Sequence, residues 1–181
     1  GQRVSDPALL QRRPIHVRIG NDPEIRPQTG LSQADLVYEE TIEGGGTRLT
    51  AVFLSQDPEA IGPVRSARLV NLELAPQFDA ALVHSGGSDY TRWLISQSTI
   101  VDLDEFYNPA PYYYIGEDWR SRLFTSALRL REYLVKRDWE KAVPLRGFAF
   151  SPDSAPPPGG TPAQSIAIPS SGGSSVEWQY D

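Results

Sequence analysis

Apolar and polar residues alternate in the first third of the chain, as they do in strands. Residues 15–19 follow this alternation, and two β-rich runs at 35–43 and 47–55 flank Gly44-Gly45-Gly46. Glycine reaches positive φ at little cost, which tight hairpin connections require. The pattern therefore predicts a strand at 15–19 and a β-hairpin over 35–55, joined by a long irregular loop.

Helical and strand-like patterns are mixed over the rest of the chain. Leucines predict a helix over residues 65–78 that ends near Pro76 and another over 126–137. A shorter helix is expected around 90–96, with Ser88 or Asp89 as its N-cap. Because an early hairpin is followed by about three helices, we predict an α+β domain with a mixed sheet. Further short strands are expected at residues 80–84, 99–103, 112–115 and 148–150.

Composition changes sharply near residue 150. The chain has 181 residues and a mass of 20.0 kDa, enough for one packed domain and part of a second. Residues 151–163 are rich in proline and glycine, as linkers are. We predict a first domain over 1–150, a linker over 151–163, and the β-rich start of an incomplete second domain over 164–181.

Charge and residue usage exclude several classes of function. A net charge of −6 disfavours nucleic acid as a partner. The absence of cysteine excludes disulfides and thiolate metal sites, and the two histidines are far apart in sequence. Asn21, Asp22 and Glu24 carry oxygen ligands of the kind calcium prefers, but Asp-Pro turns are common without metal. We expect no metal and no cofactor. Because the chain has no methionine, we interpret it as processed or excised, and it has no apolar run that could span a membrane.

The first candidate site is Arg65-Ser66-Ala67-Arg68 at the start of a predicted helix. Arginines three positions apart share a helix face, and a helix start offers free N–H groups to an anion. With Arg48 from the hairpin, these residues predict a site for a carboxylate or phosphate. The alternative is that the arginines only form ion pairs with glutamates of the hairpin.

The second candidate is His84, at the end of a predicted strand, followed by Gly86, Gly87 and Ser88. A histidine in this position is suited to proton transfer or anion contact near neutral pH. The glycine turn into a helix is typical of a short anion-binding nest. The alternative is a histidine that is hydrogen-bonded beneath a turn.

Carboxylates form the third candidate. In a continuous strand, Asp35, Glu39 and Glu43 would share one side and Glu40 would face the other. Such carboxylates suggest an enzyme acting on a glycan or the cell wall, with His84 as acid or base and Glu39 or Glu43 as its partner. The alternative is an ordinary polar face that meets Arg48 across the hairpin.

A dense group of aromatic residues follows residue 105. It allows a core strand with an amphipathic edge, or a surface that stacks on a sugar ring or contacts another protein. The last of these would make the chain a structural subunit of a surface assembly. The aromatic residues are Phe106, Tyr107, Tyr112, Tyr113, Tyr114 and Trp119.

Several segments together resemble the YerB-like extracytoplasmic lipoprotein family of bacteria. The most distinctive is Gly62-Pro63-Val64-Arg65-Ser66-Ala67-Arg68. The matching segments keep their order and spacing from about residue 13 to residue 90. They are residues 13–15, 26–35, 37–39, 43–48, 61–68 and 84–88.

Beyond residue 100 the resemblance is looser. Phe124-Thr125-Ser126 is similar to a Tyr-Thr-Ser segment of the family, but Arg120-Ser121-Arg122-Leu123 stands where the family has a Pro-His-Asn segment. The chain therefore lacks that histidine, which makes a catalytic interpretation weaker. Residues 176–181 resemble the opening of the family's second domain.

The resemblance implies a protein outside the cytoplasmic membrane, held by an N-terminal lipid anchor that this chain lacks, and it supplies no catalytic mechanism. We expect a non-catalytic module that binds an anionic ligand, a glycan or another envelope protein through Arg48, Arg65, Arg68 and His84, with Ser66 and the turn at 86–88. The enzyme and the structural subunit remain the alternatives.

Overall fold

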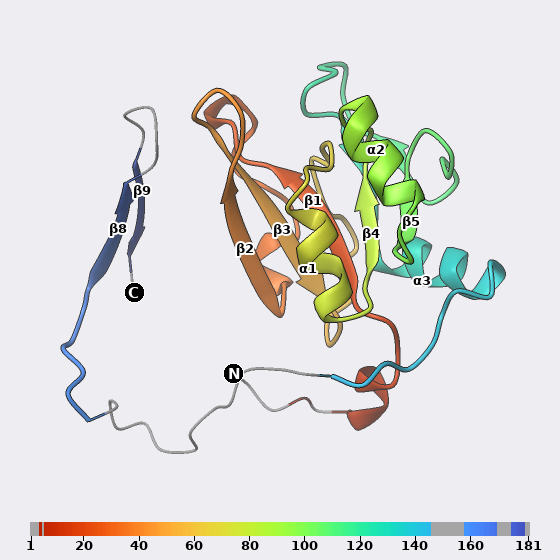
Figure 1. Ribbon diagram of the computed structural model, residues 1–181, viewed down its shortest axis with the longest axis horizontal. Coiled ribbons are helices and arrows are strands. Elements are labelled where there is room, and N and C mark those ends of the chain that lie inside the picture. The colour runs from red at the N-terminus through yellow and green to blue at the C-terminus, as the bar shows by residue number, and fades with distance from the viewer. Residues whose placement is uncertain (1–3, 5, 146–157, 170–174, 180–181) are drawn as a thin grey trace.

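A five-stranded sheet forms the centre of the computed structural model, which describes residue 4 and residues 6–145, 158–169 and 175–179 (Figure 1). Its strand order is β2-β3-β1-β4-β5. β1 pairs antiparallel with β3 and parallel with β4, so the sheet is mixed. The strands of this sheet are β1 (Ile15–Gly20), β2 (Leu36–Thr41), β3 (Thr47–Phe53), β4 (Ala81–His84) and β5 (Val101–Asp104).

Three α-helices lie in the described part of the chain. Two of them begin after a serine N-cap, and one begins without a side-chain cap. Ser88 and Ser126 cap α2 and α3 by accepting backbone N–H groups three residues later. Val70 precedes α1 without any side-chain cap. The helices are α1 (Asn71–Gln77), α2 (Asp89–Ser96) and α3 (Ala127–Lys136).

The two faces of the sheet carry different kinds of side chain. Ile15, Val17 and Ile19 of β1 are fully buried in the main hydrophobic core, together with Leu130 and Leu134 of α3. Because successive strand residues point to opposite faces, the polar residues between them face α1 and α2. That second face lies toward the viewer in Figure 1, and it includes a smaller core around the buried Leu82.

The smaller elements complete the described structure. Short 3₁₀ turns precede β1 and interrupt the loop between β1 and β2. They are Pro7–Leu10, Pro23–Ile25 and Leu31–Gln33. Two further two-stranded sheets pair β6 (Tyr113–Tyr114) with β7 (Leu123–Phe124), and β8 (Ser165–Pro169) with β9 (Ser175–Gln179).

The α+β class, the mixed sheet, the early hairpin and the three helices are confirmed. The predicted strand at 148–150 and part of the predicted linker lie outside the described residues. The division into two domains stays a prediction. None of the helices in the described part of the chain is long and apolar enough to cross a membrane.

The helix predicted over residues 65–78 is wrong in its first half, because α1 begins only at Asn71. The backbone of residues 65–67 donates hydrogen bonds to β1 and to the turn after β4 instead. Arg65 N–H donates to the Arg18 carbonyl at 2.9 Å, and Ala67 N–H donates to the Gly86 carbonyl at 2.9 Å. This segment therefore bridges β1 and the turn that follows β4, and it is not helical.

Candidate anion-binding site

Arg18 lies on the face of β1 opposite the main core and is completely buried. Its Nη1 donates to Glu40 Oε2 at 2.7 Å and to the hydroxyl of Thr50. Thr50 in turn donates to Glu40 Oε1 at 2.6 Å. Alternation along β1, β2 and β3 places these three side chains on the same face, where they form a buried polar network.

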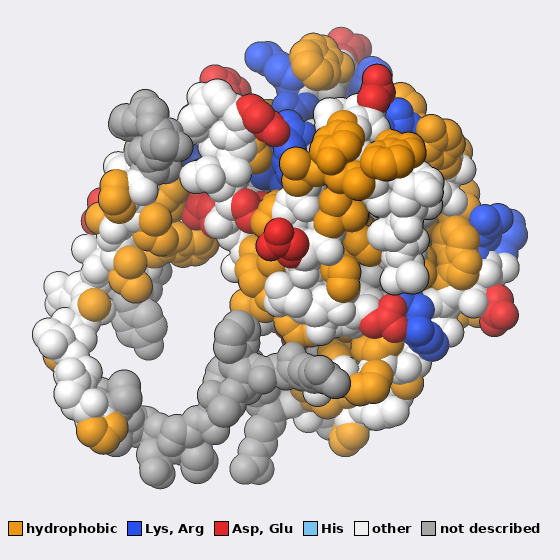
Figure 2. Space-filling model, in the orientation of Figure 1, with side chains coloured by type: hydrophobic (Ala, Val, Ile, Leu, Met, Phe, Trp, Pro, Cys, Tyr) orange, Lys and Arg blue, Asp and Glu red, His pale blue; other side chains and the backbone are white. Residues whose placement is uncertain are grey.

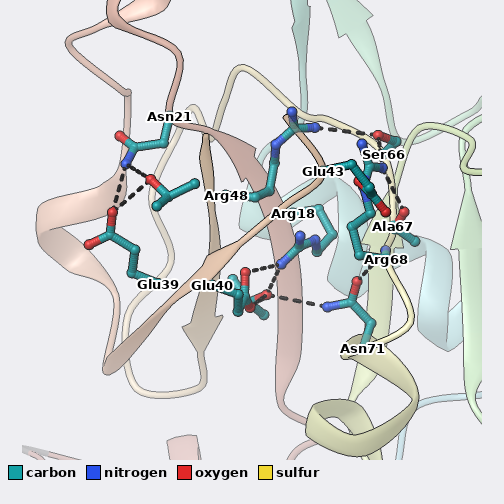
Figure 3. Close-up of polar contacts among 12 residues, drawn as sticks. Arg18, Asn21, Glu39, Glu40, Glu43, Arg48, Ser66, Ala67, Arg68 and Asn71 are labelled. Carbon is teal, nitrogen blue, oxygen red and sulfur yellow. Dashed lines mark hydrogen bonds and ion pairs between the residues drawn. The ribbon is translucent and has the colours of Figure 1, made fainter. Parts of the chain in front are cut away.

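Ser66 is the point where Arg48 and Arg68 meet (Figure 3). Its hydroxyl accepts from Arg48 Nη1 at 3.3 Å and from Arg68 Nη1 at 2.6 Å. Arg68 Nη1 also donates to the Ala67 carbonyl, and its Nε donates to Glu43 Oε2 at 2.8 Å. Arg48 is 5% exposed, whereas the side chains of Arg68 and Glu43 are 25% and 80% exposed, so the cluster runs from a buried guanidinium to an ion pair at the surface.

Arg65 adds a fourth guanidinium at the side of the cluster. Its Nη2 lies 3.4 Å from Asp22 Oδ2, an oxygen that Arg48 Nη2 approaches at 4.0 Å. The guanidinium also lies over the exposed ring of Trp119, 5.9 Å from the ring centre. Arg65 therefore borders the arginine cluster from the side of the loop between β1 and β2.

Positive charge exceeds negative charge in this cluster. Arg18, Arg48, Arg65 and Arg68 are paired with three carboxylates, those of Asp22, Glu40 and Glu43. Several buried N–H groups have no hydrogen-bond partner among the described residues. They are Nε and Nη2 of Arg18, Nε of Arg48 and Nε of Arg65.

Burial and neighbouring positive charges both act on the pKa of Arg48. Burial, followed by repulsion from Arg65 and Arg68, lowers this pKa to about 10. Burial also lowers the pKa of Arg18, which Glu40 partly offsets. An added negative charge near these groups would relieve the repulsion, because opposite charge favours the protonated form.

A hollow of about 300 Å³ opens beside the cluster and is lined by Glu43, Ser66, Arg68, Gly87 and Ser88. We call this hollow the arginine pocket. A Cβ atom at Gly87 would lie 3.3 Å from the Ala67 carbonyl oxygen, so glycine lets the turn pack closely against residues 66–68. Ser88 brings the start of α2 to the same hollow.

His84 does not line the arginine pocket, because its side chain is fully buried. Its Nδ1 lies 2.8 Å from the Gly86 carbonyl oxygen and its Nε2 lies 2.8 Å from Asp102 Oδ1. Both ring nitrogens are thus engaged beneath the turn. The pairing of His84 with Glu39 or Glu43, which the alternative enzyme function required, is wrong, since Asp102 on the neighbouring parallel strand is its carboxylate partner.

The turn at Gly86 already binds a carboxylate of the protein itself, that of Asp104. Gly86 has a positive φ of 67° and its N–H donates to Asp104 Oδ1 at 2.9 Å. Asp104 is buried and also accepts from Arg92 Nε at 3.1 Å. Gly86 therefore shapes the turn, while Gly87 and Ser88 reach the pocket.

The expected carboxylate face is also wrong, because β2 covers only Leu36–Thr41. Asp35 accepts from the backbone of Leu54 and Ser55. Glu39 accepts from Asn21 and Thr47, while Glu43 lies in the hairpin turn against Arg68. These carboxylates do not converge on one reaction centre. No group of three or more histidine, aspartate or glutamate side chains in the described residues could hold a metal ion.

Arg18 and Glu40 are the functional candidates that sequence reasoning missed, although it did place Glu40 on the face opposite Glu39. Arg18 belongs to an alternating strand, and a charged residue there is normally expected to face water. The sequence does contain a signal for this network, because Arg18, Thr50 and Glu40 lie on three strands that pair with one another through β3. Sheet order was needed to recognise it.

Comparisons with known proteins identify relatives of the chain. Residues 1–140 match the family described as protein of unknown function (DUF3048), N-terminal domain. The chain is 38% identical over 123 residues to the "Putative lipoprotein YerB" of Bacillus subtilis (strain 168), covering 61% of this chain and 37% of that protein. A crystal structure of YerB from Bacillus subtilis matches with a TM-score of 0.69 and 30% identity, covering 75% of this chain and 47% of the other. In both comparisons the chain thus spans less than half of YerB.

Proposed function

This chain belongs to the DUF3048 N-terminal domain family, and we propose that its domain binds a small anionic group, a phosphate or a carboxylate, in the arginine pocket. The observation that carries the proposal is the excess of arginine over carboxylate in the cluster around Ser66, where Arg18 and Arg48 are buried and Arg65 and Arg68 are partly exposed. Buried N–H groups of Arg18 and Arg48 without partners add to it.

Burial makes such a cluster a strong attractor for an anion. Charges that are removed from water interact through a lower effective dielectric, so repulsion between the arginines and attraction to an anion are both larger than at a surface. Guanidinium groups also bind phosphate and carboxylate oxygens in bidentate geometry. Arg68 reaches the hollow while Arg48 and Arg18 lie next to it, which suits one compact anion.

We favour a binding function over a catalytic one because the buried His84 is not accessible to a substrate. A general acid or base must come within hydrogen-bond reach of the substrate, and both ring nitrogens of His84 face protein acceptors. We propose that the domain works outside the cytoplasmic membrane, in a lipid-anchored protein, because its relative is named as a lipoprotein.

Arg68→Gln is expected to weaken the binding of inorganic phosphate about 10- to 100-fold, because a hydrogen bond to a charged group contributes roughly 1.5–3 kcal/mol. Isothermal titration calorimetry with phosphate measures the change. Arg120→Gln is the matched control, since Arg120 is exposed and pairs with Asp118. Equal phosphate affinity in wild type and Arg68→Gln would contradict the proposal, as would an absence of phosphate binding to wild type.

Glu43→Gln is expected to strengthen phosphate binding up to about five-fold. The Glu43 carboxylate competes with a bound anion for Arg68 Nε, and an exposed ion pair contributes at most about 1 kcal/mol. The same titration measures this gain, with Glu117→Gln as a control for the change in net charge. Weaker binding in Glu43→Gln would mean that the carboxylate supports the site.

A further inference from the structure

Two large aromatic side chains are exposed on one face of α2. Tyr90 is 60% exposed and Trp93 is 54% exposed. Their rings stack with centres 6.1 Å apart and an angle of 23° between planes. Because the residues are three apart in a helix, they form one continuous apolar surface, which we call the aromatic platform.

The aromatic platform lies on the helix whose N-cap residue lines the arginine pocket. Ser88, which lines the pocket, is the N-cap of the helix that carries Tyr90. Figure 2 shows the apolar patch over α2 next to a strip of basic side chains that separates it from the β2–β3 hairpin.

We propose that the natural ligand is a sugar monophosphate, with its phosphate in the arginine pocket and the face of its sugar ring on Tyr90 and Trp93. This inference rests on the proposed function and names the class of ligand for the same site. A pyranose ring has apolar C–H groups on its faces, which suit an aromatic surface, and hydroxyl groups around its edge.

The polar residues around the platform fit the edge of a sugar. Asp89 is exposed at the first turn of α2, and its carboxylate accepts hydrogen bonds from hydroxyl groups. Ser96 and Gln97 are exposed at the other end of the helix. Glu43 and Asp89 both carry negative charge close to the pocket, which disfavours a second phosphate and hence a polyphosphate chain.

The test compares four phosphates by isothermal titration calorimetry on this chain: inorganic phosphate, glycerol 3-phosphate, glucose 1-phosphate and adenosine monophosphate. We expect glucose 1-phosphate to bind roughly ten-fold more tightly than inorganic phosphate and glycerol 3-phosphate, since stacking on an aromatic surface adds about this factor. Adenosine monophosphate tests whether a nucleobase takes the platform instead.

Variants of the aromatic platform test the contribution of the sugar ring to binding separately from that of the phosphate. The double variant Tyr90→Ala/Trp93→Ala is expected to lose the ten-fold preference while it keeps the wild-type affinity for inorganic phosphate. Trp93→Phe keeps an aromatic face and is expected to retain most of the preference. Trp178→Ala removes another partly exposed tryptophan, on β9, and is expected to change nothing.

The outcomes distinguish this inference from the proposed function. Phosphate binding that depends on Arg68 but shows no preference for glucose 1-phosphate contradicts the inference of a sugar monophosphate and still supports the proposed anion site. The inference of a sugar monophosphate is also contradicted if the double variant keeps the preference for glucose 1-phosphate, or if adenosine monophosphate binds more tightly than glucose 1-phosphate. If no phosphate binds, both proposals are wrong.

Discussion

His16→Leu is expected to remove much of the acid sensitivity of this domain. His16 is fully buried on the α1 side of the sheet, its ring packs edge-on against Phe78, and neither ring nitrogen has a hydrogen-bond partner among the described residues. Burial, followed by repulsion from Arg18, lowers the pKa of His16 to about 3.

The direction of the pH effect follows from this lowered pKa. Above pH 6.5, His16 is neutral in the folded and unfolded states and does not make stability depend on pH. Between pH 6.5 and about 3, the unfolded chain binds a proton that the folded chain does not. The free energy of unfolding therefore falls by about 1.4 kcal/mol per pH unit, or roughly 4–5 kcal/mol over the whole window.

Urea unfolding of wild type and His16→Leu at several pH values measures this difference. The leucine variant is expected to show a shallower acid limb, and a gain of about 1–3 kcal/mol at neutral pH because a buried N–H without a partner is removed. His16→Asn serves as control, since it does not titrate but remains polar. It should flatten the acid limb without the neutral gain, and parallel acid limbs in all three proteins would contradict the prediction.

Glu40→Ala is expected to destabilise the fold by about 3–5 kcal/mol, because it leaves the fully buried guanidinium of Arg18 without its carboxylate. Thr50 would also lose the acceptor of its hydroxyl. Chemical denaturation at neutral pH measures the loss of unfolding free energy.

Glu39→Ala is the matched control for this change. Glu39 is the preceding residue of β2, and it bonds to Asn21 and Thr47, away from the arginine cluster. Its removal is expected to cost about 1 kcal/mol. The double variant Arg18→Leu/Glu40→Leu should recover most of the loss, since it removes the unpaired charge together with its partner. Equal losses in Glu39→Ala and Glu40→Ala would show that Arg18 does not depend on Glu40.

Much of the local structure was predictable because it depends on neighbours in the chain. The alternation at residues 15–19 predicts β1, and the three glycines after residue 43 predict the hairpin of β2 and β3. Ser88 signals the start of α2 because a serine hydroxyl can accept the N–H of the residue three positions on. These features need no knowledge of the sheet order.

The candidate site was predictable only in part. Arg48, Ser66 and Arg68 do meet, as expected, although the predicted helix start is absent. The helix failed because β1 and Gly86 supply hydrogen-bond partners to residues 65–67, and these partners lie far away in sequence. His84 likewise took Asp102 as its partner because β4 and β5 are parallel neighbours.

The sequence by itself determined the alternation along β1, where the hairpin turns and where two of the helices begin. The tertiary structure alone decided that Arg18 is buried, that Glu40 rather than Glu39 neutralises it, and that the arginine pocket opens next to α2. The physical reason is that alternation and capping act over a few residues. Burial and charge pairing depend on which strands become neighbours, and the order β2-β3-β1-β4-β5 brings those strands together.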